Sequence, residues 1–563
     1  MASRSLDRLL SELEQCRYRF GRGTAPHVVG LLSKLRPRRF PDVPSLIRFH
    51  EALLFLRAFP QGPSVVRATN GLLLRFSQRV KQLQAAGADM DDFDPLEVSG
   101  IAGTSMQDTL SYDVVRWLAT RTQEVGIVWD EWDGERALAA VWPRFMPLLG
   151  DDGYVEADVP WQRWLQIASG RRNLKWLVQQ FEKLPLSDVE KSQLYDSLRL
   201  PVRWCLNNLH LSRTRNWNRV PRVFYHQKSL TSRSEVSLEV ELAQSPPSLH
   251  RLSPAQGKIV INTIREVMLV RYRELYGTTL GDPRSVVRAD VGRGVSIYLW
   301  NLPPERRLPL RAYVAGFTMK NGVPINYIEA IGLFEWIEVG FNTFYTFRGG
   351  EVAWIYAQAL RCLCALTGAT CISMYPYQLG HGNDEAIESG AFWFYRKLGF
   401  RPGRADLLAL TEREERKMVR HPEHRTSARV LRRLAEGHVF CELPGSQVGA
   451  WDTFATRNIG LKVNRRMAEK FAGDSQHFRN AASAWLARVL HLSLTSWAPL
   501  QRSSFEDFAV VLSLVPELPS WSEHEKGALL RIIRAKSALR ETRYLTLLQQ
   551  HRQLRQVFLK LGS

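Results

Sequence analysis

Apolar residues recur at intervals of three and four over most of residues 1–225, which predicts a mainly helical N-terminal region. Pro and Gly separate the helical stretches. The clearest of these stretches are residues 65–83, 110–122, 161–184 and 188–209. Residues 1–16 form an amphipathic pattern with acids and a broken apolar run, unlike a secretory signal. We therefore expect a cytoplasmic protein.

The pattern changes over residues 226–252, which we interpret as a linker with a possible strand. Polar and apolar residues alternate over 234–242, as in a β-strand, and residues 244–253 are rich in Ser and Pro. Ser253-Pro254 is then typical of a helix start.

Residues 253–410 combine helical and strand patterns, with Asn321-Gly322 as a hairpin signal between two of the strands. The expected helices cover residues 254–277 and 351–366, and a last one ends at 398. The expected strands cover residues 295–299, 310–319, 324–341, 370–377 and 407–410. This order predicts an α+β fold with a central mixed sheet, flanked by helical regions at 1–225 and 411–563.

The charge adds a candidate class of partner. The net charge is +20, and residues 411–563 hold 25 Lys and Arg against 15 Asp and Glu. A basic surface attracts nucleic acid, anionic lipid or an acidic protein; the alternative is that the charge serves only solubility. No apolar run is long enough to span a membrane.

The six cysteines form no CxxC pair, and Cys362 and Cys364 lie two residues apart on a predicted helix, facing apart. We therefore expect reduced, buried thiols and no metal site.

The run Phe347-Arg348-Gly349-Gly350-Glu351-Val352-Ala353 lies between a predicted strand and a predicted helix. Glycine permits a close approach of the backbone to a ligand, and the helix start offers unpaired amides to a diphosphate. Arg348 would add an ion pair. The structural alternative is an ordinary turn.

A second run, residues 391–400, ends a predicted helix at Gly399 after a basic last turn. Tyr395 lies one turn before that end. Its phenol, with an ordinary pKa near ~10, suits a general acid that returns a proton to a thiolate. The structural alternative is a tyrosine packed in the core.

Together these runs resemble the GNAT superfamily of N-acyltransferases, whose diphosphate loop reads Q/R-x-x-G-x-G/A and whose later signature is roughly N-x-x-A-x-x-x-Y-x-K-x-G-F. Glu351 stands where the family has its central glycine, and Glu388 or Asn383 stands for the asparagine. The matching residues are Arg348 and Ala353 in the loop, Gly368 at the helix end, and Ala391, Tyr395, Lys397, Gly399 and Phe400.

The resemblance implies that an acetyl or other acyl group passes directly from acyl-CoA to an amine on a small molecule or a protein, without a metal. Tyr395 would be the general acid. The strand at Val339 and Phe341 would pair with the pantetheine arm. The diphosphate would be held by Arg348, Gly349, Gly350, Glu351, Val352 and Ala353.

A general base would come from the central strands, where Glu329, Glu335 and Glu338 lie. On one unbroken strand Glu329 and Glu335 would share a face and Glu338 would take the other, unless a bulge reverses the order. We favour Glu329.

The expected function is an acyl-CoA-dependent N-acyltransferase. The alternative is an inactive scaffold on the same core whose basic C-terminal helices hold nucleic acid or an acidic protein. A carrier protein or an aminoacyl-tRNA is a further candidate acyl donor.

Overall fold

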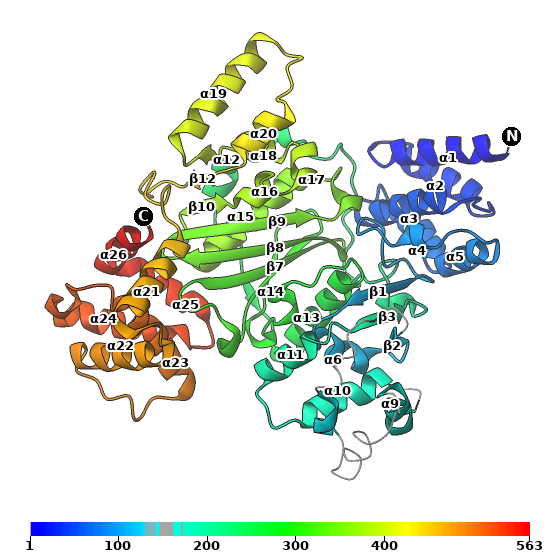
Figure 1. Cartoon of the computed structure of the whole chain (residues 1–563). Helices are drawn as coiled ribbons and strands as arrows, with labels where there is room; N and C mark the ends of the chain where they lie inside the picture. The colour runs from blue at the N-terminus through cyan, green and yellow to red at the C-terminus, as the bar shows by residue number, and fades with distance from the viewer. Residues whose placement is uncertain (1, 130–131, 133–136, 138–140, 146–160, 171–172) are drawn as a thin grey trace. The chain divides into compact units, whose positions relative to one another are not determined.

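The computed structural model of the protein describes residues 2–563 except 130–131, 133–136, 138–140, 146–160 and 171–172 (Figure 1). The chain divides into two compact units. The first unit contains residues 1–229, 262–280 and 321–324. The second contains residues 230–261, 281–320 and 325–563, and therefore every residue that the motifs single out.

The first unit is mainly helical, as predicted, and also contains a small sheet that the apolar spacing did not predict. Its principal helices are α1 (Ala2–Cys16), α2 (Thr24–Leu35), α3 (Val43–Ala58), α4 (Pro63–Leu73), α5 (Phe76–Ala85), α6 (Tyr112–Arg121), α9 (Trp161–Ser169), α10 (Asn173–Lys183), α11 (Asp188–Asp196) and α14 (Tyr276–Thr279). The stretches 65–83 and 161–184 thus each contain two helices, and residues 171–172 lie outside the described residues.

Three antiparallel strands form the small sheet, in the order β1-β3-β2. They are β1 (Ser105–Thr109), β2 (Val125–Ile127) and β3 (Pro201–Cys205). The prediction of one helix over 188–209 is therefore wrong in its second half. Pro201 has no amide hydrogen to continue a helix, and it starts β3 instead.

A nine-stranded mixed sheet forms the centre of the second unit, which confirms the predicted fold class. The strand order is β11-β12-β10-β9-β8-β7-β6-β5-β4. The strands are β4 (His250–Arg251), β5 (Val287–Asp290), β6 (Val295–Asn301), β7 (Ala312–Lys320), β8 (Val323–Leu333), β9 (Trp336–Thr343), β10 (Cys371–Met374), β11 (Arg401–Pro402) and β12 (Val439–Glu442).

Two hairpins define the centre of this sheet. At the first, Asn321 and Gly322 both have positive φ, 51° and 80°, as a tight turn between β7 and β8 requires. The second is at Phe334-Glu335, where Phe334 has φ 55°. It divides the single strand expected over 324–341 into β8 and β9, so Glu335 lies in a turn.

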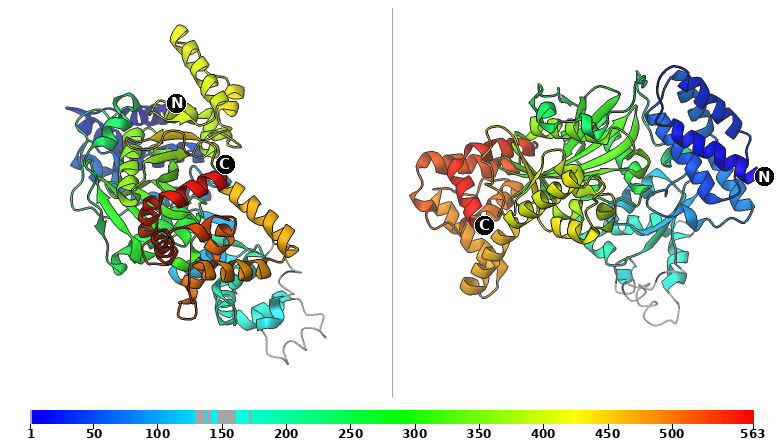
Figure 2. Two further views of the ribbon diagram at one scale, coloured as in Figure 1. Left: turned by 90° about the vertical axis from the view of Figure 1, so that its left-hand side faces the viewer. Right: turned by 90° about the horizontal axis from the view of Figure 1, so that it is seen from above.

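Three further expectations are wrong. Residues 234–242 do not form a strand, because Ser237 caps the short helix α12 (Leu238–Ala243) by accepting from the amide of Val240. Residues 407–410 lie in α19 (Ala405–Arg420), which projects from the sheet (Figure 2). The helix that starts at Pro254, α13 (Pro254–Leu269), ends before Gly277.

The parallel pair β9 and β10 is joined by α15 (Val352–Thr367), which ends at Gly368 with φ 72°, as the sequence predicts. The two strands are paired over only three residues each: Trp336 to Glu338 of β9 lie beside Cys371 to Ser373 of β10. Strand β9 continues to Thr343, whereas β10 ends at Met374, before α16 (Pro376–Leu379). We call this parting of β9 residues 339–343 from β10 the fork.

The two faces of the sheet at the fork have different covers. Phe341 packs edge-on against Tyr356 of α15, with ring centroids 4.9 Å apart, so Phe341 and Val339 point to the α15 face. Trp336 stacks on Trp451 at 5.1 Å on the opposite face, which we call the Trp336 face. Glu338, two residues on, shares that face.

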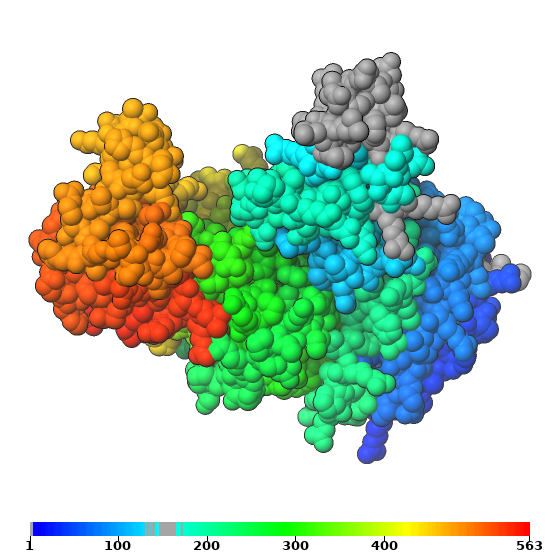
Figure 3. Space-filling model, turned by 90° about the horizontal axis from the view of Figure 1, so that it is seen from below, coloured from blue at the N-terminus to red at the C-terminus, as the bar shows by residue number. Residues whose placement is uncertain are grey.

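The C-terminal region is helical, as predicted, and its helices form one contiguous body (Figure 3, orange to red). They share an apolar core with Trp336 and Phe334 of the sheet. The helices are α21 (Thr456–Phe471), α22 (Ser475–Val489), α23 (Pro499–Leu512), α24 (Glu523–Lys536), α25 (Glu541–Gln550) and α26 (Arg552–Gly562).

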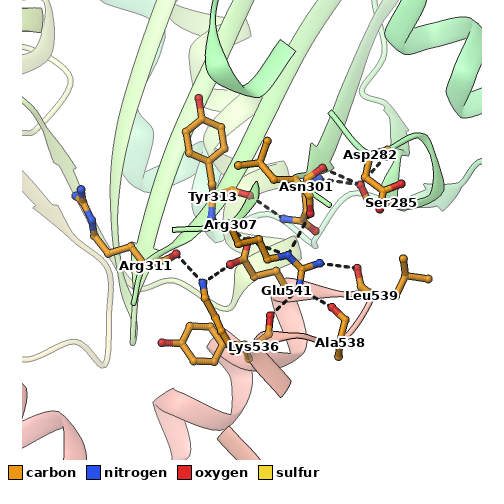
Figure 4. A network of polar contacts seen from close by, with 12 residues as sticks. Asp282, Ser285, Asn301, Arg307, Arg311, Tyr313, Lys536, Ala538, Leu539 and Glu541 are labelled. Atoms are coloured by element: carbon orange, nitrogen blue, oxygen red, sulfur yellow. Dashed lines mark hydrogen bonds and ion pairs between the residues drawn. The ribbon is translucent and has the colours of Figure 1, made fainter. Parts of the chain in front are cut away.

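A buried polar network attaches this body to the start of β7 (Figure 4). Arg307 donates to the carbonyls of Lys536 (2.7 Å), the last residue of α24, and of Ala538 (2.6 Å) and Leu539 (3.0 Å) just after it. Lys536 donates to the Glu541 carboxylate, which also accepts from the amide of Tyr313 at 3.1 Å. Burial lowers the pKa of Lys536. Two cations and one acid are thus buried together.

Replacing Glu541 by Gln should lower the free energy of unfolding by about 3 kcal/mol, because Lys536 would keep its buried charge without a carboxylate. Urea denaturation at pH 7 measures the change. The matched control is Glu412→Gln, which removes an exposed partner of Arg416 at 4.0 Å and should cost less than about 1 kcal/mol. Equal effects of the two substitutions would contradict the role given to the network.

Candidate functional site

The fork brings together most residues that the resemblance singles out. Val339 and Phe341 are buried on the α15 face of β9. Beyond Glu338, the edge of β9 turned toward β10 pairs with no strand among the described residues. The amides and carbonyls of an unpaired strand edge can pair with an extended amide chain.

The loop after β9 leads directly to the start of α15. It contains a 3-10 turn, Tyr345–Phe347, after which the amide of Gly350 donates to the Phe347 carbonyl at 2.8 Å. The first turn of α15 contains no acidic side chain. The amides of Val352 and Ala353 lie in this turn, where a helix has no carbonyl of its own to offer them. The helix start therefore suits an anion.

Glu351 immediately precedes α15, and its side chain is fully buried. Its carboxylate lies 2.9 Å from Arg293 and 3.4 Å from Lys320, and accepts from the amide of Thr231 at 3.2 Å. Burial lowers the pKa of Lys320 to about 8, although Glu351 opposes that shift. Two cations thus neutralise the acid at the position where the resembled loop motif has a glycine.

Arg348 lies on the surface beside the helix start and is already engaged. Its guanidinium forms an ion pair with Glu385 and lies 3.9 Å from the ring centroid of Tyr345. The Tyr345 hydroxyl also donates to Glu385, at 2.9 Å. A diphosphate bound by Arg348 would therefore compete with an exposed carboxylate.

Two buried polar side chains near the end of β9 lack partners. Asn326 is fully buried, and neither its amide nitrogen nor its amide oxygen has a hydrogen-bond partner among the described residues. Thr343, opposite it in the β8–β9 register, has a buried hydroxyl in the same condition. Both share the α15 face with Phe341.

Leaving such groups unpaired costs about 1–3 kcal/mol each, so each calls for a partner that the described residues do not supply. Asn326 and Thr343 therefore offer hydrogen-bonding groups to a further polar partner on the α15 face near the end of β9.

Tyr395 lies on the α15 face of the sheet, in α18 (Ala391–Arg396). Its ring packs edge-on against Tyr356 at 5.7 Å and against Phe400 at 5.8 Å. Burial raises the pKa of Tyr395, so the phenol stays protonated at neutral pH, as a general acid must. The same packing is typical of a core tyrosine.

Neither candidate for the family's asparagine reaches the fork through a described contact. Asn383 caps the short helix α17 (Asp384–Glu388) by accepting from the amide of Ala386 at 3.2 Å. Glu388 is the last residue of that helix and is exposed.

The three glutamates that could supply a base lie in different places. Glu329 and Glu338 share the Trp336 face, because their register partners are Gly340 and Ile331. The expectation that they take opposite faces is wrong, since the Phe334-Glu335 hairpin intervenes. Glu329 accepts a hydrogen bond from Tyr313, and Glu335 forms an ion pair with Arg555.

Glu338 lines a cavity of about 550 Å³ on the Trp336 face, which we call the Glu338 cavity. Its carboxylate lies 2.9 Å from Nε2 of His438, the residue before β12, and the ring of Tyr375 packs edge-on against His438 at 5.4 Å. Glu338 is the last β9 residue paired with β10, and Tyr375 directly follows β10. The cavity therefore adjoins the fork.

Sequence reasoning missed His438, Asn326, Lys320 and Arg293. His438 is 100 residues from Glu338, and no local spacing connects the two. Asn326 and Lys320 lie in the largely apolar strands β8 and β7, whose sequences indicate only the core of a sheet. A lysine within an otherwise apolar strand, next to the Asn-Gly turn, was the one available signal.

Replacing Glu351 by Gln should lower the free energy of unfolding by about 3 kcal/mol at pH 7, because Lys320 loses its buried carboxylate. The pKa of Lys320, about 8, lies below its ordinary 10.5, so between these values the folded chain binds fewer protons than the unfolded chain. The cost of burying this cation is complete below pH 8 and falls as pH rises.

The destabilisation should therefore shrink between pH 7 and pH 10, measured by urea denaturation of both proteins at each pH. The control Glu385→Gln removes the exposed carboxylate that pairs with Arg348 and should show no such trend. A constant effect of Glu351→Gln across this range would exclude Lys320 as the linked group.

Within the described ranges, no three His, Cys, Asp or Glu side chains are grouped as ligands for a metal ion. None of the described helices combines the length and the apolar character needed to cross a membrane. Comparison of the chain with protein-family models, curated proteins and solved structures found no match.

Proposed function

We propose that the protein is an acyl-CoA-dependent N-acyltransferase of the GNAT type, acting in the cytoplasm on a primary amine. The observation that carries this proposal is the fork, where β9 and β10 part beside the N-terminus of α15. The motif resemblance requires both features at the same place. The six free cysteines agree with a reducing compartment.

Acyl-CoA, with acetyl or a longer chain, would bind along the open edge of β9 near Val339 and Phe341. Its diphosphate would meet the first amides of α15, at Val352 and Ala353, together with Gly349 and Gly350 of the turn. Arg348 would contribute an ion pair after exchanging its partner Glu385.

The bound donor would supply the thioester carbonyl, whose C–S bond breaks as the amine nitrogen forms the new C–N bond. On the Trp336 face, His438 and Glu338 would accept the proton that the amine loses. On the α15 face, Tyr395 would return a proton to the thiolate. The structural contacts favour Glu338 over Glu329 as the base, because Glu338 lines the cavity and Glu329 is bonded to Tyr313.

The second candidate function is an inactive scaffold on the same core. The Arg348–Glu385 ion pair and the aromatic packing of Tyr395 favour it, because both residues already have structural roles. In that case the basic C-terminal helices would hold nucleic acid or an acidic protein.

Acetyl-CoA should bind with a Kd on the order of micromolar, and Arg348→Ala should weaken the binding about tenfold. Glu385→Gln should not weaken it, because that change frees the Arg348 guanidinium. Calorimetry on the full chain measures the affinity of acetyl-CoA for the unchanged protein and for the two variants. Arg361→Ala, near the middle of α15, is the control and should leave the affinity unchanged. Absence of binding to acetyl-CoA and to a longer acyl-CoA would favour the scaffold.

Glu338→Gln and Tyr395→Phe should each lower kcat about a hundredfold while the KM for acyl-CoA changes little, because neither side chain holds the donor in the ground state. The matched control is Glu329→Gln, on the same sheet face but outside the cavity. Steady-state kinetics with a primary amine measures these values. If Glu329→Gln alone abolishes turnover, the base is Glu329; unchanged turnover in Tyr395→Phe removes Tyr395 from the mechanism.

A further inference from the structure

The far side of the Glu338 cavity is formed by the start of a helix from the C-terminal body. Residues 453–457 line it, and they include Thr456 and Arg457 in the first turn of α21. The residue before this helix is Ala455, which has no side chain that can cap it, and the first turn contains no acid. Among the described contacts, the amides of Thr456 and Arg457 therefore have no acceptor.

The side chain of Thr456, the first residue of α21, adds a second observation to that of the open backbone amides. Its hydroxyl oxygen is buried and has no hydrogen-bond partner among the described residues. Most buried hydroxyls in folded proteins are paired, so this donor points to a group that the cavity receives.

Each of the three acids that line the cavity forms an ion pair, and one arginine of the lining has no acidic partner among the described residues. Glu338 faces His438 and Arg311, at 2.9 and 3.9 Å. The other two acids are also paired: Asp452 with Arg401 at 3.0 Å, and Glu436 with Arg404 at 3.6 Å.

Arg457 is exposed and has no acidic partner among the described residues. It sits in the same turn as the open amides and the unpaired Thr456 hydroxyl. A guanidinium next to a helix start is a favourable place for a carboxylate or a phosphate.

We propose that the Glu338 cavity binds an acceptor that carries an anionic group, a carboxylate or a phosphate, in addition to its amine. This inference rests on the proposed function for the role of the amine. The anion would meet Arg457, the Thr456 hydroxyl and the first amides of α21, and the amine would lie by Glu338 and His438. A cavity of about 550 Å³ has room for a molecule of the size of a small amino acid or a phosphorylated amine.

The selectivity would then come from the C-terminal helical body rather than from the sheet. The sheet supplies Glu338 and His438, and α21 supplies the group that distinguishes one amine from another.

Three primary amines that differ only in the second group test this inference: ethanolamine, β-alanine and O-phosphoethanolamine. Calorimetry on the full chain without acyl-CoA measures their binding, so the result does not depend on acyl transfer. We expect β-alanine or O-phosphoethanolamine to bind at least tenfold more tightly than ethanolamine. The stronger of the two identifies carboxylate or phosphate as the anion.

Arg457→Ala should remove this advantage, and Arg457→Lys should retain part of it. Arg465→Ala, an exposed arginine further along α21, is the matched control and should change nothing. Equal binding of the three amines, no binding of any, or an advantage that survives Arg457→Ala would overturn the inference. Binding of acetyl-CoA in the same preparation would show that the proposed function is unaffected by that result.

Discussion

The parallel pairing of β9 with β10 is the constraint on which the rest of the site depends. Two parallel neighbours need a crossover connection, and here the crossover is α15, so a helix must begin where β9 ends. The pairing stops after Ser373 because the chain turns at Pro376, which has no amide hydrogen for a ladder and starts α16. An open strand edge and an open helix start therefore lie together as a consequence of topology.

Glu351 shows how this arrangement accommodates a residue that should repel a diphosphate. A carboxylate next to a helix N-terminus is favoured by the helix dipole, but taking it out of water carries a large penalty. Arg293 and Lys320 offset that penalty from two neighbouring elements of the sheet, and the side chain is fully buried. Arg293 and Lys320 therefore neutralise the charge of Glu351 inside the protein. The first amides of α15 keep the positive electrostatic potential that attracts another anion.

The parts of the fold that depend on local chemistry were predictable from the sequence. Asn321-Gly322 and Gly368 have the positive φ angles that their residue types favour, so the first hairpin and the end of α15 were placed correctly. The hairpin at Phe334-Glu335 was not, because a phenylalanine with positive φ gives no turn signal and is held there by packing against Phe558 and Trp451.

The candidate site also combines features set by neighbouring residues with features set by the order of the strands. The loop, α15 and Tyr395 follow from motifs of neighbouring residues, whereas the pairing of Glu338 with His438 follows from strand order alone. β12 inserts between β10 and β11, and that insertion brings a residue from the far side of α19 and α20 (Ala428–Leu434) to the fork. Alternation of residues along β9 cannot reveal it, since the alternation only says which side chains share a face.

The opposite positions of Tyr395 and Glu338 bear on the mechanism that we propose for the fork. Tyr395 packs against α15, and Glu338 opens into the cavity on the Trp336 face, so the sheet separates the two groups. In the proposed acyl transfer, the amine would lose its proton to Glu338 and His438 on the Trp336 face, and the thiolate would gain one from Tyr395 on the α15 face.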